Sequence, residues 1–190
     1  MITPLYRAVE HDHIEAVKLL IEHGADYINI HKALSWRTGM AVLNYLVDHG
    51  CDFDGMYNLS DNTALHRAIR NDSYYVCQLL VCNGADIEAR NDNGNTPLLA
   101  TWRHGYDPNC GIISLLLDRG ADINAINTKT GDTLLHSVAR LRDCVDVVRL
   151  LLNRGADPRI KNKKGATVLH VAEGSCVYMI ARAMKDMSTS

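Results

Sequence analysis

The chain has 190 residues, of which 47% are hydrophobic and 22% are charged, an ordinary composition for a folded unit that excludes a disordered chain. The formal net charge of −2 conceals an asymmetry, because residues 1–95 carry 7 Lys and Arg against 13 Asp and Glu, a difference of −6, whereas residues 96–190 carry 13 against 9, a difference of +4. Generic binding to a phosphate backbone needs a strongly basic protein, so nucleic acid is disfavoured as the main partner.

The cysteines and the apolar segments indicate the cellular setting. The six cysteines are scattered among apolar residues and lack the paired short spacings of a zinc site or a secreted disulfide framework. No apolar stretch approaches the roughly 20 residues that a membrane helix needs, and the first residues contain no signal-peptide core. We therefore expect a monomer in the cytoplasm or nucleus, with no membrane association.

Two short strings recur along the chain and mark its helices. The first string is a threonine followed by apolar residues, and it begins at Thr3, Thr63, Thr96, Thr133 and Thr167. The second string is an apolar run closed by Gly-Ala-Asp or Gly-Cys-Asp, with its glycine at positions 24, 50, 84, 120 and 155. A threonine hydroxyl caps the start of a helix, and a glycine suits the left-handed residue that ends one. Each pair of strings therefore predicts two successive helices.

Individual elements follow in chain order. Thr3-Pro4 combines an N-cap with a residue of fixed φ, so a short helix is predicted to begin there. The polar segment between Asp122 and Thr133 contains Gly131 and is predicted to be a turn. After it, apolar residues recur at three- and four-residue steps, so a helix with one buried face is predicted; these residues are Val145, Val148, Leu151 and Leu152. The chain is predicted to finish in a capping helix.

The linked strings, at a period near 33 residues, resemble ankyrin repeats, which consist of a turn followed by two helices. The resemblance covers nearly the whole chain. It implies one all-α domain over residues 1–190, an ankyrin-repeat solenoid of helix-turn-helix units with projecting β-turn fingers, whose core is the row of interfaces between neighbours. We expect six repeats, at about 1–29, 30–56, 57–90, 91–126, 127–161 and 162–190.

Two repeats depart from this pattern. Only residues 27–30 separate Asp26 from His31, so the second repeat is predicted to lack the finger that repeats three to six carry. Residues 104–110 include Asp107-Pro108-Asn109, which is strong turn chemistry, and they are predicted to bulge at the end of the stack away from the fingers.

Catalysis and metal binding are not expected. A histidine recurs at one position of the repeat, and the resemblance implies that its imidazole hydrogen-bonds backbone in the adjoining turns. Copies in separate units cannot converge on one ion; they are His31, His66, His136 and His170. Cys77 and Cys82 have no further ligands to complete a zinc set, and no nucleophile or phosphate-binding motif is present. We therefore expect no enzyme, no metal and no cofactor.

Partner-binding residues follow from the resemblance, which implies a concave face built from the fingers and the outer ends of the first helices. Arginine occupies the same position in three consecutive repeats, beside lysines on the fingers, which predicts a basic groove; a merely solvated charged face is the alternative. Trp and Arg dominate binding energy when they are central and desolvated. The candidates are Trp36, Arg70, Asn71, Trp102, Arg103, His104, Lys129, Arg140, Leu141, Lys163 and Lys164.

The sequence thus predicts a small adaptor or inhibitor that recognises another protein, with an acidic or phosphorylated segment favoured. Two alternatives stay open: an ankyrin segment of a larger enzyme, channel or pathogen effector, and a binder of a small anion such as an inositol phosphate. If the concave face is not used, the next candidate surfaces are the loop at 104–110 and an apolar stripe of the terminal helix around Met179, Ile180 and Met184. Fold alone does not name the partner.

Overall fold

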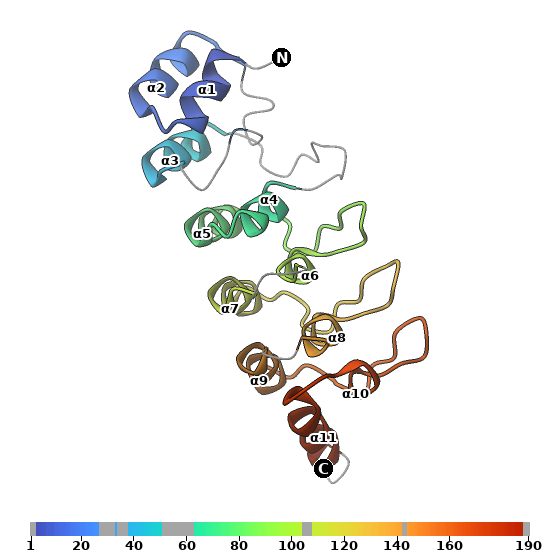
Figure 1. The fold of residues 1–190 in the computed structure, drawn as a ribbon. Helices are drawn as coiled ribbons and strands as arrows, with labels where there is room; N and C mark the ends of the chain where they lie inside the picture. The colour runs from blue at the N-terminus through green and yellow to red at the C-terminus, as the bar shows by residue number, and fades with distance from the viewer. Residues whose placement is uncertain are drawn as a thin grey trace. The chain divides into compact units, whose positions relative to one another are not determined.

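The computed structural model describes residues 3–26, 33, 38–50, 63–103, 108–141 and 144–187. Within these ranges the regular elements are helices (Figure 1). The chain forms two compact units, Met1–Asp92 and Asn93–Ser190. Residues 93–95 carry no charge, so the charge asymmetry of the sequence coincides with this division: the first unit carries −6 and the second +4.

The first unit is built from pairs of short helices. α1 packs against α2 and α4 packs against α5, while α3 contacts both α2 and α5. The bounds are α1 Pro4–Glu10, α2 Ile14–Glu22, α3 Met40–Asp48, α4 Ala64–Arg70 and α5 Tyr74–Cys82. A side chain also links the pairs, because the Asp12 carboxylate accepts a hydrogen bond from the Gly39 backbone N–H at 2.7 Å.

The second unit repeats this arrangement. The pairs are α6 with α7, α8 with α9 and α10 with α11, and contacts of α8 with α10 and of α9 with α11 stack one pair on the next. The bounds are α6 Pro97–Ala100, α7 Cys110–Asp118, α8 Leu134–Ala139, α9 Val145–Asn153, α10 Val168–Val171 and α11 Cys176–Asp186. In the predicted apolar face of α9, Val148 and Leu151 are fully buried, whereas Val145 and Leu152 are partly exposed.

The predicted helix signals are confirmed in the described parts of both units. The hydroxyl of the capping threonine accepts a hydrogen bond from the backbone N–H three residues on, as at Thr3, Thr63, Thr96 and Thr133. The glycine of the recurring Gly-Ala-Asp adopts the left-handed conformation after the second helix, as Gly155 does with φ of +90°. The two strings therefore specify where the helices begin and end.

Fingers connect the pairs of the second unit. In residues 122–133, Asn127 donates its backbone N–H to the Asp132 carbonyl at 2.8 Å, and in residues 157–167, Asn162 donates to the Ala166 carbonyl at 2.9 Å. The two fingers lie side by side (Figure 1), joined by a hydrogen bond from the Lys163 N–H to the Thr130 carbonyl at 3.0 Å. These hairpin-like turns confirm the predicted fingers at both places.

Several predicted features lie outside the described residues: residues 27–31 of the short link at 26–31, residues 104–107 of the loop at 104–110, and the finger before α4. The stripe expected on the terminal helix is accessible only in part. Ile180 is fully buried where α11 packs against α9 and α10, whereas Met179 and Met184 are partly exposed. The most exposed large apolar side chains of α11 are Val177 and Tyr178. In the part of the chain that the structure describes, no helix is long and apolar enough to cross a bilayer.

Candidate partner-binding site

An asparagine side chain shapes each of the fingers at 122–133 and 157–167 and ties it to the finger before. The Asn127 Oδ1 accepts the backbone N–H groups of Lys129 and Thr130 at 2.8 and 2.9 Å. Its Nδ2 donates to the Asn93 carbonyl at 2.8 Å and to the Asn95 Oδ1 at 2.5 Å. A single amide thus fixes the turn of its own finger and the spacing to its neighbour.

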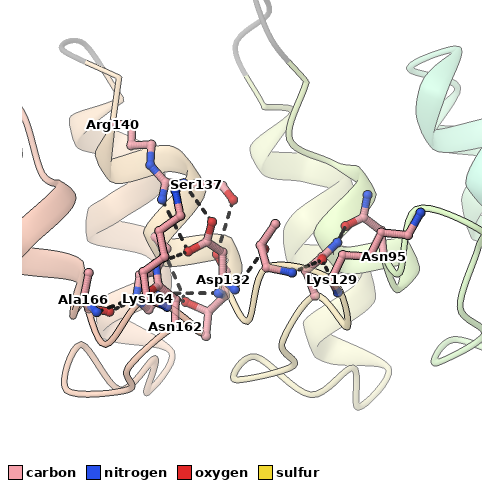
Figure 2. Close-up of polar contacts among 12 residues, drawn as sticks. Asn95, Lys129, Asp132, Ser137, Arg140, Asn162, Lys164 and Ala166 are labelled. Carbon is pink, nitrogen blue, oxygen red and sulfur yellow. Dashed lines mark hydrogen bonds and ion pairs between the residues drawn. The ribbon is translucent and has the colours of Figure 1, made fainter.

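Asn162 repeats this arrangement one finger later. Its Oδ1 accepts the backbone N–H groups of Lys164 and Ala166 at 3.0 and 3.1 Å, and its Nδ2 donates to the Asp132 Oδ1 at 2.7 Å (Figure 2). Asp132 and Asn95 occupy the same position, directly before the capping threonine. We call residues 93–95, 127–132 and 162–166 the finger ladder. Sequence reasoning missed these asparagines, although Asn91, Asn127 and Asn162 recur before successive capping threonines.

Arg140, a predicted binding residue, is held by its own finger. Its Nη1 and Nη2 donate to the two carboxylate oxygens of Asp132 at 3.1 and 3.3 Å (Figure 2). Burial alone raises the pKa of Asp132, but hydrogen bonds from Arg140 and Asn162 and the Arg140 charge outweigh it, so the pKa lies below its usual value. The Asp132 side chain is 13% exposed and that of Arg140 37%. Much of the arginine charge is therefore already compensated.

The hydrogen bonds of Asp132 are predicted to stabilise the fold, and Asn95 at the equivalent position suggests the matched control variant. Asp132→Ala leaves the Arg140 guanidinium and the Asn162 amide without their acceptor, so we expect a loss of about 1–3 kcal/mol of unfolding free energy in urea melts. Asp132→Asn keeps an acceptor oxygen, as Asn95 does at the equivalent position, and should cost clearly less. Equal losses in the two variants would show that the negative charge of Asp132 stabilises the finger, and that its hydrogen bonds with Arg140 and Asn162 do not.

The finger lysines confer positive charge on the ladder. Lys163 is fixed between fingers, because its Nζ donates to the Thr128 carbonyl at 2.5 Å. Lys129 and Lys164 are exposed, and within the described residues their ammonium groups take part in no ion pair. Of the predicted binding residues, the structure thus brings Lys129, Lys163, Lys164 and Arg140 onto two adjacent fingers and the helix beside them.

The remaining predicted residues lie at the ends of first helices. Arg70 is exposed and Asn71 partly exposed at the end of α4, in the first unit. Trp102 and Arg103 follow α6 in the second unit, the tryptophan half-buried and the arginine exposed, and Leu141 follows Arg140. Trp36 and His104 lie outside the described residues. Because Arg70 belongs to a different compact unit from Arg103 and Arg140, one continuous arginine row stays a prediction.

The recurring histidine has the hydrogen bonds that were expected of it. In His136, which is fully buried, Nδ1 accepts the Thr133 backbone N–H at 3.3 Å, and Nε2 lies 3.2 Å from the Ala166 carbonyl in the next finger. Nε2 therefore carries the proton. The His136 Nδ1 also lies 2.9 Å from the Thr133 hydroxyl, and His66 and His170 repeat this contact with the hydroxyls of Thr63 and Thr167, at 2.9 and 2.7 Å. The structural interpretation is confirmed for His136.

Metal-ligand and thiol chemistry give no competing site. Burial raises the pKa of the Cys77 thiol to about 12, so this cysteine stays protonated at neutral pH and fills the core. Cys82 is exposed on the same helix. In the described part of the chain, no three His, Cys, Asp or Glu side chains are grouped closely enough to hold a metal ion.

Stacked helix pairs joined by fingers define a helical repeat protein. The chain belongs to the ankyrin repeat family: a model of three ankyrin repeat copies matches residues 29–91, 83–162 and 102–187, and a single-repeat model matches residues 2–33. Ankyrin repeats are protein–protein interaction modules. The number of six repeats remains a prediction.

Relatives of this chain include animal and viral proteins. The mouse (Mus musculus) B-cell lymphoma 3 protein homolog is 31% identical over 99% of this chain, which spans 43% of that protein. The variola virus ankyrin repeat protein OPG189 is 27% identical over 86% of this chain, which spans 30% of that protein. Among solved structures, a chain in the complex of the Bd0816 predatory endopeptidase from Bdellovibrio bacteriovorus with immunity protein Bd3460 matches with a TM-score of 0.76 and 25% identity, over 97% of each chain. The chain therefore spans less than half the length of these two curated relatives.

Proposed function

We propose that this chain is an adaptor or inhibitor that binds an acidic or phosphorylated segment of a partner protein along the finger ladder. The observation that carries the proposal is the pair of exposed lysines, Lys129 and Lys164, which form no ion pair within the described residues and lie on fingers that Asn127 and Asn162 hold in place. Because these fingers are already ordered, binding loses little conformational entropy on this side. The charge of +4 on residues 93–190 supports an acidic partner.

The arginines and lysines have different parts in this proposal. The finger lysines act at the rim, where charge mainly raises the association rate. Arg103 is exposed beside the half-buried Trp102 and becomes desolvated against a carboxylate or phosphate of the partner. Arg140 is bound to Asp132, so a partner carboxylate would have to compete with Asp132 for it. Arg140 therefore serves first to hold the ladder and only second to bind.

We propose binding and not catalysis. Both ring nitrogens of His136 are used within the fold, so this buried imidazole has no lone pair or proton to offer a substrate. The solved complex of a predatory endopeptidase with an immunity protein, in which a chain of similar fold occurs, is in keeping with a role in partner recognition.

The test begins with a quantitative pull-down from lysate of the source cells, followed by binding kinetics on the captured partner. Arg103→Ala is expected to weaken binding at least about tenfold through faster dissociation, whereas Lys164→Ala should mainly flatten the dependence on salt. Lys185→Ala is the control, because Lys185 is exposed in the same unit but lies on α11, outside the fingers.

Two outcomes would count against the proposal. Binding that is indifferent to Arg103 and Lys164 and flat between low and physiological salt would mean that the partner uses another face. Micromolar binding of an inositol phosphate in calorimetry, lost in a Lys129→Glu, Lys164→Glu double variant, would instead favour the small-anion alternative.

A further inference from the structure

A groove lies between the second helices of the last two repeats, away from the finger ladder. α9 and α11 are in contact, and α9 lies on the side of the second unit opposite the finger loops (Figure 1). Between the two helices is a hollow of about 340 Å³. Its lining residues are spaced three and four apart on each helix, so each helix contributes one face; they are Arg149, Leu152 and Asn153, and Met179, Arg182, Ala183 and Asp186.

The groove combines an apolar floor with basic walls. Leu152, Met179 and Ala183 are all partly exposed, so the floor is accessible from solvent. Each wall contributes one arginine. Arg149 is exposed and has no hydrogen bond or ion pair within the described residues, and Arg182 is 72% exposed, with only a 4.0 Å approach to Asp186.

We propose that this groove is a second docking surface, and that its occupant is an acidic helical segment of a partner protein. An apolar side chain of the segment enters the hollow over Leu152 and Met179, as in recognition of a helix by a groove. A carboxylate of the segment lies between the guanidinium groups of Arg149 and Arg182, which bind carboxylates through paired N–H donors. Charge complementarity favours an acidic occupant. The groove contains two arginines and one aspartate, and the second unit as a whole carries a charge of +4.

Asp186 gives the proposal a sharp consequence. Its carboxylate already lies 4.0 Å from the Arg182 Nε, so it competes with the incoming carboxylate for the same guanidinium. Asp186→Asn removes this competitor and a repulsive charge while it preserves the shape of the groove. The variant should therefore bind an acidic segment more tightly than the wild-type chain does, an effect that a merely structural role of Asp186 does not produce.

The experiment uses the full chain and a defined probe. The probe is a short, Ala-rich helical peptide that carries one Phe flanked by Glu on the same face, and its counterpart has Lys in place of Glu. Binding is measured by fluorescence anisotropy, and its location by NMR chemical shifts of the labelled chain. We expect shifts in α9 and α11, and no binding of the Lys counterpart.

Variants decide the outcome, with folding verified by circular dichroism. Arg149→Glu and Arg182→Glu are each expected to weaken binding of the acidic peptide at least about tenfold, and Asp186→Asn to strengthen it about two- to threefold. Lys161→Glu makes the same charge change elsewhere on the unit and should leave the affinity within about twofold.

Other results would overturn the proposal. These are failure of the acidic peptide to bind, shifts confined to the fingers, or equal losses in Lys161→Glu and Arg149→Glu. Vesicles of phosphatidylcholine with phosphatidylserine that bind through Arg149 and Arg182 more tightly than the peptide would assign the groove to a membrane surface instead. Because the finger ladder is not mutated, the function proposed for it stands or fails separately.

Discussion

Gly131→Ala is expected to be one of the most damaging single substitutions in the finger ladder. Gly131 has φ of +74°, and a Cβ added there would lie 2.6 Å from the Lys163 backbone nitrogen in the next finger. An alanine in the left-handed conformation costs about 1–2 kcal/mol, and forcing a packed neighbour aside costs typically about 1–3 kcal/mol more. We therefore expect the free energy of unfolding, measured in urea, to fall by about 2–5 kcal/mol.

Gly165→Ala is the matched control. Gly165 holds the equivalent position in the following finger with φ of +75°, but an added Cβ would meet nothing within 4 Å. This variant should lose only the conformational part, about 1–2 kcal/mol. The difference between the two variants measures how firmly the fingers are held against each other. Identical losses would show that the fingers move apart without cost.

His136→Ala is expected to lower the free energy of unfolding by about 1–3 kcal/mol, because it leaves the Thr133 N–H without its acceptor and removes one of the two donors of the Ala166 carbonyl. Chemical denaturation at pH 7.5 measures this loss. His66→Ala should also be destabilising, since His66 is 2% exposed and contacts Thr63 in the same way. Stoichiometric zinc binding at micromolar affinity that disappears in these variants would instead make the histidines ligands.

His136 also makes the free energy of unfolding depend on pH. Burial, more than any other influence, lowers the pKa of His136, against the opposing effects of the Ala166 carbonyl and the Asp132 charge. The unfolded chain, with a histidine pKa of about 6.5, therefore binds the proton first. This contribution to stability is fully present above about pH 6.5 and is lost as the pH falls toward the lower pKa of the folded state. In His136→Ala this part of the acid destabilisation should be absent.

The helices and fingers could be predicted from the sequence because the signals for them are local. The Thr133 hydroxyl caps the start of α8, and Gly155 adopts the left-handed conformation that terminates the helical segment of α9. Both effects involve only residues close in the sequence. The period of these signals carries the family resemblance, and with it the structural role of His136.

The pairing of charges could not be predicted in the same way. Arg140 was expected to face a partner, but it lies against Asp132, eight residues earlier, because the finger folds back beside α8. The amide of Asn162 reaches that same carboxylate from a finger 30 residues further along the chain. Such contacts depend on how one repeat stacks on the next. The groove between α9 and α11 has the same origin, since neither helix alone contains both of its arginines.

The finger that contains Ala166 differs from the two before it in a way that matters for lengthening the array by design. Asn95 and Asp132 each offer an oxygen to the asparagine of the next finger, whereas the equivalent Ala166 offers only a methyl group. A repeat grafted behind this finger with the same asparagine would place an amide where no side-chain acceptor exists. If buried, that amide would cost about 1–3 kcal/mol. Extending the array therefore calls for an acceptor at residue 166 before any new helix is added.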